Sequence, residues 1–344
     1  MDFRLSRLLN LCGVNNPLRH HRRFGLWLAT LLAVAGSAHS SVSLLVEEPY
    51  GLFGSVNPTG HSAIYLNHVC AESPTILRHC RPDESGVVLS RYSRIRKFDW
   101  IAVPLLPYLY AVEHAEDVPD WADKADVDML RRQYAEVHLS SLVSATKGYD
   151  AKNVWPQLLG VAYIRKIYSF EVDTTDEQDD SLISEYNDSA NRSRFNLFTN
   201  NCADFSRSVL NFYYPHSASR SITADLGITT PKQIAKALTA YARKHDDVRL
   251  NEIIIPQVPG NTPRSHTTRG VVESLLKTKK YVVPIAVLNP YVVAGIAVSY
   301  LSTGRFRMAK NAPVIPVAEQ ERMLVSGGFV EPITGPAVLQ PQSP

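Results

Sequence analysis

The stretch that decides the fold is Asn200-Asn201-Cys202-Ala203-Asp204-Phe205, where a polar loop runs into an amphipathic helix. Apolar residues recur at spacings of three to five and predict a helix that ends near Pro215: Phe205, Val209, Leu210 and Tyr213. Asn201 is a favourable N-cap, so Cys202 is expected at the first helical position. There the unpaired N–H groups and the helix dipole favour an anion, which predicts a lowered thiol pKa and a nucleophilic thiolate. The alternative is a small buried apolar cysteine.

The first forty residues have the composition of a signal peptide. Residues 1–23 carry five arginines against a single acidic residue, and an apolar run follows from Phe24 to Ala35. Gly36-Ser37-Ala38 and Ala38-His39-Ser40 are candidate cleavage sites. The alternative is an uncleaved membrane anchor, which the shortness of the apolar run disfavours. We therefore expect residues 1–40 to be a signal peptide for export to a bacterial periplasm or cell envelope, with inner-membrane association as an open alternative.

Cysteine usage fits export. Removal of the signal peptide would take away Cys12 and leave three cysteines in an oxidising compartment. Cys70 and Cys80 flank a loop between two strand candidates, and a disulfide between them would remove loop-closure entropy from the unfolded chain. Cys202 is then an unpaired thiol, which suggests reactivity. The alternative is a zinc site that adds the neighbouring histidines, although the spacing matches no standard finger or ribbon.

A general base has to come from elsewhere in the chain, since nucleophile and base are neighbours in space rather than in sequence. His61 is the best placed histidine, because Pro58-Thr59-Gly60 predicts a turn and Ser62–Leu66 predicts a strand directly after it. The alternative is an ordinary capping or surface histidine.

The order of the two motifs points to a family. The chain has Gly60-His61-Ser62-Ala63-Ile64-Tyr65 first and Asn201-Cys202-Ala203-Asp204-Phe205 afterwards, whereas papain-like enzymes usually present cysteine first. This order resembles the circularly permuted branch of the NlpC papain-like superfamily, which includes lecithin retinol acyltransferase-like proteins, PPPDE peptidases and uncharacterised bacterial families. The resemblance covers about residues 47–215.

The resemblance implies an α+β fold, in which a small antiparallel sheet packs on the nucleophile helix, with helical insertions and a C-terminal apolar appendage. It implies that Cys202 is the nucleophile and His61 its base, and that Asn201 is similar to the asparagine that often precedes the family cysteine, a candidate for N-cap and oxyanion site. A third polar group normally orients the imidazole. Antiparallel pairing would bring Ser90, Tyr92 or Ser93 opposite His61, although none is the histidine or acid that the family prefers.

The domain organisation follows from these motifs. We expect a catalytic domain over 41–215, a helical extension and linker over 216–280, an apolar segment over 281–303, and a disordered Pro-rich tail over 304–344. Helices are predicted from Asp120 to Leu139 and from Pro231 to His245. An acidic run between Glu171 and Asp180 is interpreted as a solvated loop, with a calcium site as the alternative.

The apolar segment from Tyr281 to Leu301 has no charge and lies between basic residues on both sides: Lys277, Lys279, Lys280, Arg305 and Arg307. Its length could span a bilayer. Pro284, Asn289 and Pro290 interrupt the run and suit a re-entrant, interfacial or buried hairpin equally well. Membrane contact through Tyr281–Leu301 is therefore expected.

Net charge excludes nucleic acid as a partner. The formal charge is +3, of which residues 1–38 contribute +4, as five Arg against one Asp, so that −1 remains for the mature chain. No Gly-rich phosphate loop, cofactor motif or metal motif is present in the sequence. We expect a thiol hydrolase or acyltransferase that acts on an amide or ester bond of a cell-wall peptide, acyl lipid or lipoprotein. The alternative is a non-catalytic membrane-attached envelope scaffold with the same fold.

Overall fold

The computed structural model describes residues 39–51, 58–92, 98–140, 142 and 158–315. Nearly all of the expected signal peptide lies outside these residues. The tail beyond residue 315 and the candidate Ser93 lie outside them as well.

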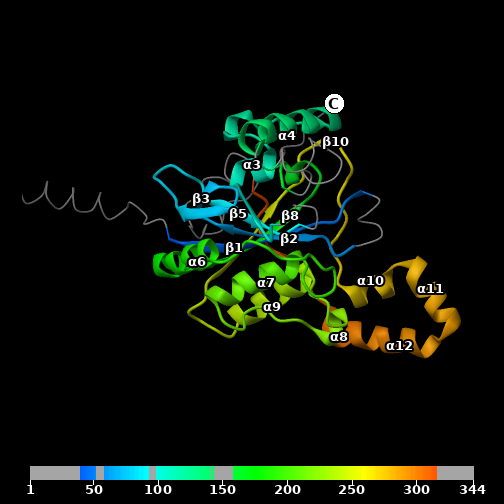
Figure 1. Ribbon diagram of the computed structural model, residues 1–344. Coiled ribbons are helices and arrows are strands. Elements are labelled where there is room, and N and C mark those ends of the chain that lie inside the picture. The colour runs from blue at the N-terminus through cyan, green and yellow to red at the C-terminus, as the bar shows by residue number, and fades with distance from the viewer. Residues whose placement is uncertain (1–38, 52–57, 93–97, 141, 143–157, 316–344) are drawn as a thin grey trace, which may run out of the picture. The chain divides into compact units, whose positions relative to one another are not determined.

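A six-stranded sheet in the order β6-β5-β2-β1-β8-β9 forms the centre of the fold (Figure 1). Every neighbouring pair is antiparallel. The fold is therefore α+β with an antiparallel sheet, as expected. The strands, in chain order, are β1 (Ser41–Glu47), β2 (His61–Leu66), β5 (Val87–Ser90), β6 (Ile101–Pro104), β8 (Ile167–Asp173) and β9 (Leu250–Ile255).

Helices cover both faces of this sheet, so the central strands β1 and β2 are buried along their whole length. On one face, Leu45, Ala63 and Tyr65 pack beneath α3 (Leu105–Tyr110), α4 (Lys124–His138) and η3 (Val161–Tyr163). On the other face, Leu44, Ile64 and Phe170 pack against α6 (Asp176–Asp188), α7 (Cys202–Tyr213) and α9 (Pro231–Ala242). Figure 1 shows α3 and α4 on one side of the sheet and α7 and α9 on the other.

Two segments differ from their expected structure. β9 lies within the range expected to be a helical extension and linker, yet it forms the edge of the central sheet beside β8. Residues 313–315 follow it in parallel, since Ile254 N–H donates to Pro313 O at 2.9 Å and Ile315 N–H donates to Ile254 O at 3.0 Å. This part of the range expected to be disordered is hydrogen-bonded to the sheet.

The acidic run expected as a loop is divided between β8 and α6. A capping box at Thr175 and Gln178 starts α6, and acidic residues occupy its first turn. Carboxylates are stabilised there by the positive end of the helix dipole, so the loop expectation is wrong.

A small hairpin of β3 (Val69–Ser73) and β4 (Ile76–His79) follows β2. The expected disulfide between Cys70 and Cys80 closes it, with a Cα–Cα distance of 4.8 Å. Both sulfur atoms are therefore committed to each other, and the alternative zinc site is wrong. Short elements complete the described chain: η1 (Ala115–Asp117), β7 (Ala122–Asp123), α8 (Ile222–Asp225) and β10 (Gly260–Asn261).

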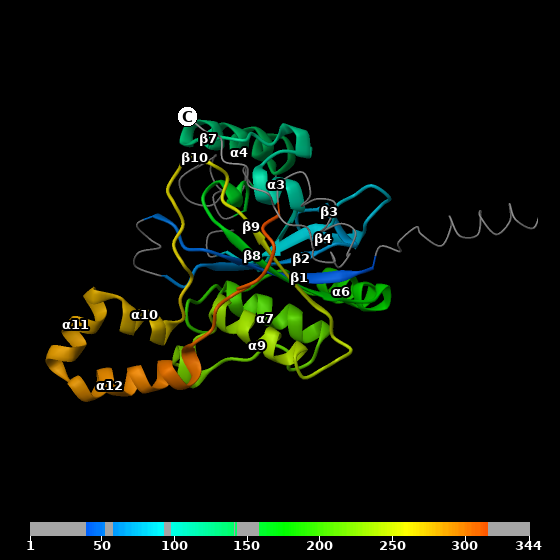
Figure 2. The ribbon, with the colours of Figure 1, turned by 180° about the vertical axis from the view of Figure 1, so that it is seen from behind.

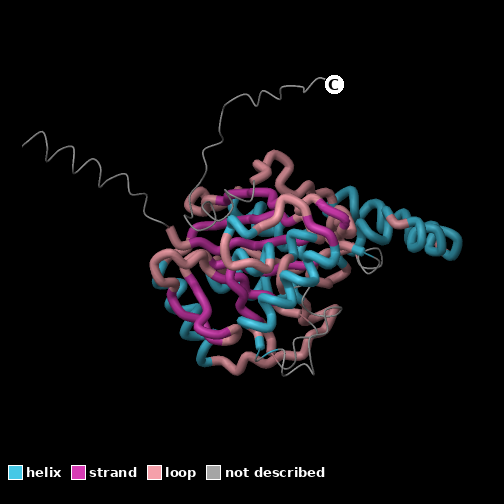
Figure 3. Tube along the Cα trace, turned by 90° about the horizontal axis from the view of Figure 1, so that it is seen from above, coloured by secondary structure: helices cyan, strands magenta, loops and turns pink. Residues whose placement is uncertain are grey.

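The apolar segment forms a helical hairpin. After α10 (Val271–Lys277), α11 (Lys279–Leu288) and α12 (Pro290–Ser299) meet at Asn289, which caps α12, and η4 (Tyr300–Gly304) closes the hairpin. In the described part of the chain, no helix combines the length and the apolar character that crossing a bilayer requires. Figures 2 and 3 show the hairpin projecting beside the layers of sheet and helices.

Candidate active site

Cys202 occupies the first position of α7, and it is the free cysteine of the described residues. Asn201 is the N-cap, where its Oδ1 accepts from Asp204 N–H at 3.0 Å. Its Nδ2 donates to the carbonyl oxygens of Leu197 at 2.9 Å and Thr229 at 3.0 Å. The Asn201 side chain therefore holds the loop before α7, and at the helix start the Ala203 N–H hydrogen-bonds the Cys202 thiol.

Asp204 completes this helix start. Its Oδ2 accepts from Asn201 N–H at 3.2 Å, and its Oδ1 accepts from Arg220 Nη2 at 2.7 Å and from the Thr229 hydroxyl. The carboxylate is buried, so the ion pair with Arg220 fixes α7 to the chain beyond it. Asp204 was not predicted as a site residue, although an Asn with an Asp three residues later has the spacing of a capping box.

His61 is the first residue of β2, and its backbone is paired with Glu47 at the end of β1. The preceding Gly60 has φ +76°, and a Cβ built there would lie 2.2 Å from the Glu47 carbonyl oxygen. Glycine is thus required at 60 for two independent reasons, positive φ and close backbone approach. The turn at Gly60 therefore fixes the register of β2 against β1, in which His61 pairs with Glu47.

The partner of the His61 ring is Ser90. His61 Nε2 lies 3.0 Å from Ser90 Oγ at the end of β5. Tyr92 contacts the imidazole through its ring, edge to face, with centroids 6.2 Å apart. Of the residues expected opposite His61, the structure brings Ser90 into hydrogen-bonding distance.

A buried polar chain continues from Ser90. The Ser90 hydroxyl hydrogen-bonds Tyr108 of α3, and the Tyr108 hydroxyl donates to Glu47. Glu47 Oε2 lies 3.2 Å from Arg165 Nη1. All these side chains are buried. The Glu47 carboxylate and the Arg165 guanidinium therefore lie in the protein interior, between the sheet and α3. Burial raises the pKa of Glu47, while Arg165 and Tyr108 act in the opposite direction.

Glu47, Tyr108 and Arg165 were not predicted from the sequence. They lie in β1, in α3 and between η3 and β8, about sixty residues apart from one to the next, so no local spacing joins them. One signal was present: Glu47 directly follows the apolar run Leu44–Val46 in a buried strand, and a buried acid is rare unless it is paired.

The start of β2 separates the thiol from the imidazole. Side chains alternate between the faces of a strand, and Ser62 faces α7, where it accepts from Ser206 Oγ at 3.0 Å. The Ser62 backbone N–H and hydroxyl also hydrogen-bond the Cys202 thiol. His61 faces the α3 side, and among the described residues no hydrogen bond joins its ring to the thiol. The two groups thus approach one end of β2 from opposite faces.

Burial sets the charge state of both groups. It raises the pKa of the Cys202 thiol above its ordinary value, hydrogen bonds from Ser62 oppose this, and the Glu47 carboxylate adds to it. The expected lowering of the thiol pKa is therefore wrong for this structure, because desolvation outweighs the helix end. Burial and then the charge of Arg165 lower the pKa of His61 to about 3. Near neutral pH the site holds a neutral thiol and a neutral imidazole.

Comparisons with known proteins give one structural similarity. The crystal structure of a type VI secretion system effector, TseH, is similar over 64% of this chain and 95% of that chain, at 10% sequence identity and a TM-score of 0.30. No family model matches the chain, and no curated protein matches it. A TM-score this low does not establish a shared fold, so the function has to be inferred from the site itself.

Proposed function

We propose that the protein is an exported cysteine hydrolase or acyltransferase with a permuted papain-like core, in which Cys202 is the nucleophile and His61 its general base. The observation that carries this proposal is the buried chain from His61 through Ser90 and Tyr108 to Glu47. It begins at His61, whose neighbour in β2, Ser62, hydrogen-bonds the thiol on the other face of the strand. The disulfide between Cys70 and Cys80 suits an oxidising compartment.

The donor and acceptor roles along this row of hydrogen-bonded side chains select one tautomer of His61. Tyr108 donates its proton to Glu47, so the Tyr108 oxygen accepts from Ser90. The Ser90 oxygen is then the acceptor for a proton on His61 Nε2. With Nε2 protonated, Nδ1 carries the free lone pair and is the atom that can take the thiol proton. In this arrangement, Glu47 at the end of the row thereby determines the tautomer of His61.

The reaction proceeds by acyl transfer. As Cys202 Sγ attacks the carbonyl carbon, its proton passes to His61 Nδ1, and N–H groups at the start of α7 stabilise the oxyanion. Collapse forms a thioester and expels the amine or alcohol, which takes the proton from His61. Water or an acceptor group then attacks the thioester and releases Cys202. Because the thiol and the imidazole lie on opposite faces of β2, this proton transfer requires the start of β2 to rearrange when substrate binds, which would release the imidazole from Ser90.

Acylation by an activated ester tests this proposal. Incubation with p-nitrophenyl acetate should add one acetyl group to Cys202, detected by intact mass and peptide mapping. His61→Ala should slow this step by about a hundredfold, in the range of general base catalysis. Cys202→Ala should remove the adduct and leave the thermal midpoint nearly unchanged.

A non-catalytic envelope scaffold is the second candidate, and the raised pKa of the Cys202 thiol favours it. In a scaffold, Cys202 would be acylated no faster than a free thiol of the same pKa, and His61→Ala would leave the rate unchanged. Either result would reject the enzyme.

A further inference from the structure

The α11–α12 hairpin exposes many apolar side chains, and the others are only partly covered. Neither helix contains a buried residue, and the tip is the most exposed part: Val287 is 79%, Leu288 85% and Tyr291 85% accessible. An α-helix that is apolar all around is normally enclosed by protein or by lipid. Within the described chain, this hairpin is enclosed by neither.

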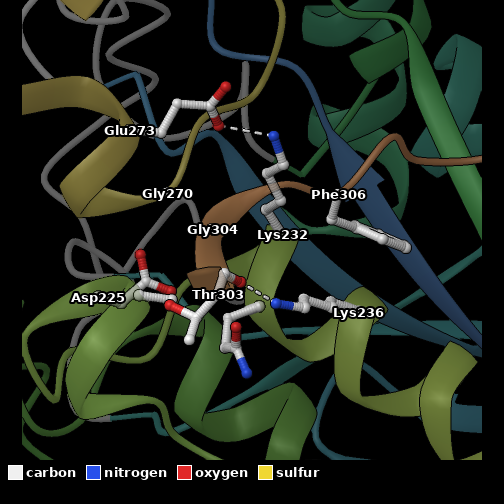
Figure 4. Close-up of a pocket in the computed structure, with 10 residues that line it drawn as sticks. Asp225, Lys232, Lys236, Gly270, Glu273, Thr303, Gly304 and Phe306 are labelled. Carbon is white, nitrogen blue, oxygen red and sulfur yellow. Dashed lines mark hydrogen bonds and ion pairs between the residues drawn. The ribbon is translucent and has the colours of Figure 1, made fainter. Parts of the chain in front are cut away.

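The base of the hairpin, by contrast, is firmly attached to the body (Figure 4). Lys232 of α9 bonds Glu273 of α10 at 2.6 Å, and Lys236 donates to the Thr303 carbonyl oxygen. The Ser299 hydroxyl donates to the Thr223 carbonyl in α8. Both ends of the hairpin are thus fixed, and its tip is held away from the sheet rather than folded back on it.

Positive charge surrounds this base. Residues 274–318 contain no Asp or Glu, while basic residues precede α11 and follow α12. A cleft of about 760 Å³ opens there, lined in part by Lys277, Arg305 and Arg307. Arg305 and Arg307 are exposed, and neither has an ion-pair partner among the described residues. The α11–α12 hairpin therefore combines an apolar tip with a basic base.

We propose that the α11–α12 hairpin inserts into one leaflet of an anionic lipid bilayer, with its tip among the acyl chains and its basic base against the phosphates. Each helix has 10 residues, or about 15 Å at 1.5 Å per residue. That is about half of a 30 Å hydrocarbon core, so the hairpin reaches the middle of the bilayer without crossing it. Polar backbone at the Asn289 turn is capped within α12, which lowers the cost of insertion.

Charge favours a bilayer over a second copy of the chain. Two hairpins packed in parallel would bring two basic bases together, whereas anionic phosphates attract each Lys or Arg near the surface. The basic residues at the base of the hairpin thus favour an anionic lipid bilayer over a second copy of the chain as its binding partner.

Vesicle sedimentation of the full chain tests the proposal. Wild type should pellet with vesicles of phosphatidylglycerol and phosphatidylcholine in equal parts. Val287→Glu with Leu288→Glu should weaken binding by about tenfold or more, because charge is disfavoured in the bilayer core. Arg305→Gln with Arg307→Gln should weaken binding by about tenfold on these vesicles and little on pure phosphatidylcholine.

Val137→Glu is the matched control, since Val137 is a similarly exposed valine on α4, far from the hairpin. It should bind as wild type does. Binding contributed by any other apolar segment is common to all variants, so the comparison isolates the hairpin. Unchanged binding of the tip variant would overturn the proposal. So would a wild-type dimer that the tip variant splits without loss of vesicle binding, since the occupant would then be a second copy.

Discussion

The end of the central sheet and the α11–α12 hairpin both depart from the usual rule that charged residues lie at the surface and apolar residues in the core. The sheet end buries charged residues, and the hairpin exposes apolar ones. At the sheet, Glu47, Arg165 and His61 are enclosed in the protein interior and connected to one another. At the hairpin, valines and leucines are left in solvent. Stability alone favours neither arrangement, because buried ion pairs rarely add net stability and exposed apolar patches invite association. The comparison locates two departures from a merely stable fold, and we propose that the first serves chemistry and the second serves binding.

The largest effect is expected where the buried charges lose a partner. Glu47→Ala leaves the Arg165 guanidinium uncompensated inside the protein and should lower the free energy of unfolding by about 3–5 kcal/mol. Urea unfolding measures this. Glu72→Ala is the control, because Glu72 pairs with Arg78 at the surface and should cost less than about 1 kcal/mol. Equal losses in the two variants would show that the buried pair has no special role.

Acid should destabilise the sheet end through His61. Its pKa is lowered from 6.5 to about 3, so the folded state binds fewer protons than the unfolded state between these values. Stability is therefore present above pH 6.5 and is lost as the pH falls toward 3. Between pH 7 and 4 this contribution is about 3 kcal/mol. His61→Gln should remove it, and urea unfolding of both proteins at the two pH values gives the difference. Parallel losses in variant and wild type would rule out the buried neutral imidazole.

Ser90 should have a smaller effect on stability and a distinct effect on reactivity. Ser90→Ala removes the link between His61 and Tyr108 and should cost about 1–2 kcal/mol. Acylation of Cys202 should slow by about tenfold, because the ring loses the bond that fixes its tautomer. Ser169→Ala is the control, since the Ser169 hydroxyl is buried in the same sheet and has no hydrogen-bond partner among the described residues. If Ser90→Ala and Ser169→Ala acylate at the same rate, the polar chain does not orient His61.

The smallest effect on folding is expected at the hairpin. Val287→Glu with Leu288→Glu replaces exposed side chains and should change the free energy of unfolding by less than about 0.5 kcal/mol. Thermal melts without vesicles measure this. A large loss would mean that the hairpin tip packs on the protein, which would remove the contrast between the two regions.

Local patterns predicted helices well, because their signals lie within a few residues. The helix expected from Pro231 to His245 is α9, with Thr230 as N-cap. The helix expected from Asp120 begins later, because Asp123 and Asp126 form the capping box that starts α4.

Long-range features were harder to predict from the sequence. Antiparallel pairing of two strands predicted that Ser90, Tyr92 or Ser93 would lie near His61, and the structure selects Ser90 as the hydrogen-bond partner of the ring. The rest of the polar chain depends on α3 and the segment between η3 and β8 packing against β1. Tertiary packing of this kind leaves no periodic pattern in the sequence. The thiol pKa depended on burial, which the helix start alone does not reveal.

The position of β9 has a consequence for biosynthesis. The sheet that carries His61 acquires its last strand from residues 250–255, after both α7 and α9 have been made. A nascent chain that stops at Tyr214 would leave the β8 edge unpaired, and such edges recruit strands from other molecules. Truncated products should therefore aggregate rather than retain a partly folded sheet, because the sheet cannot close until residue 255 has been made.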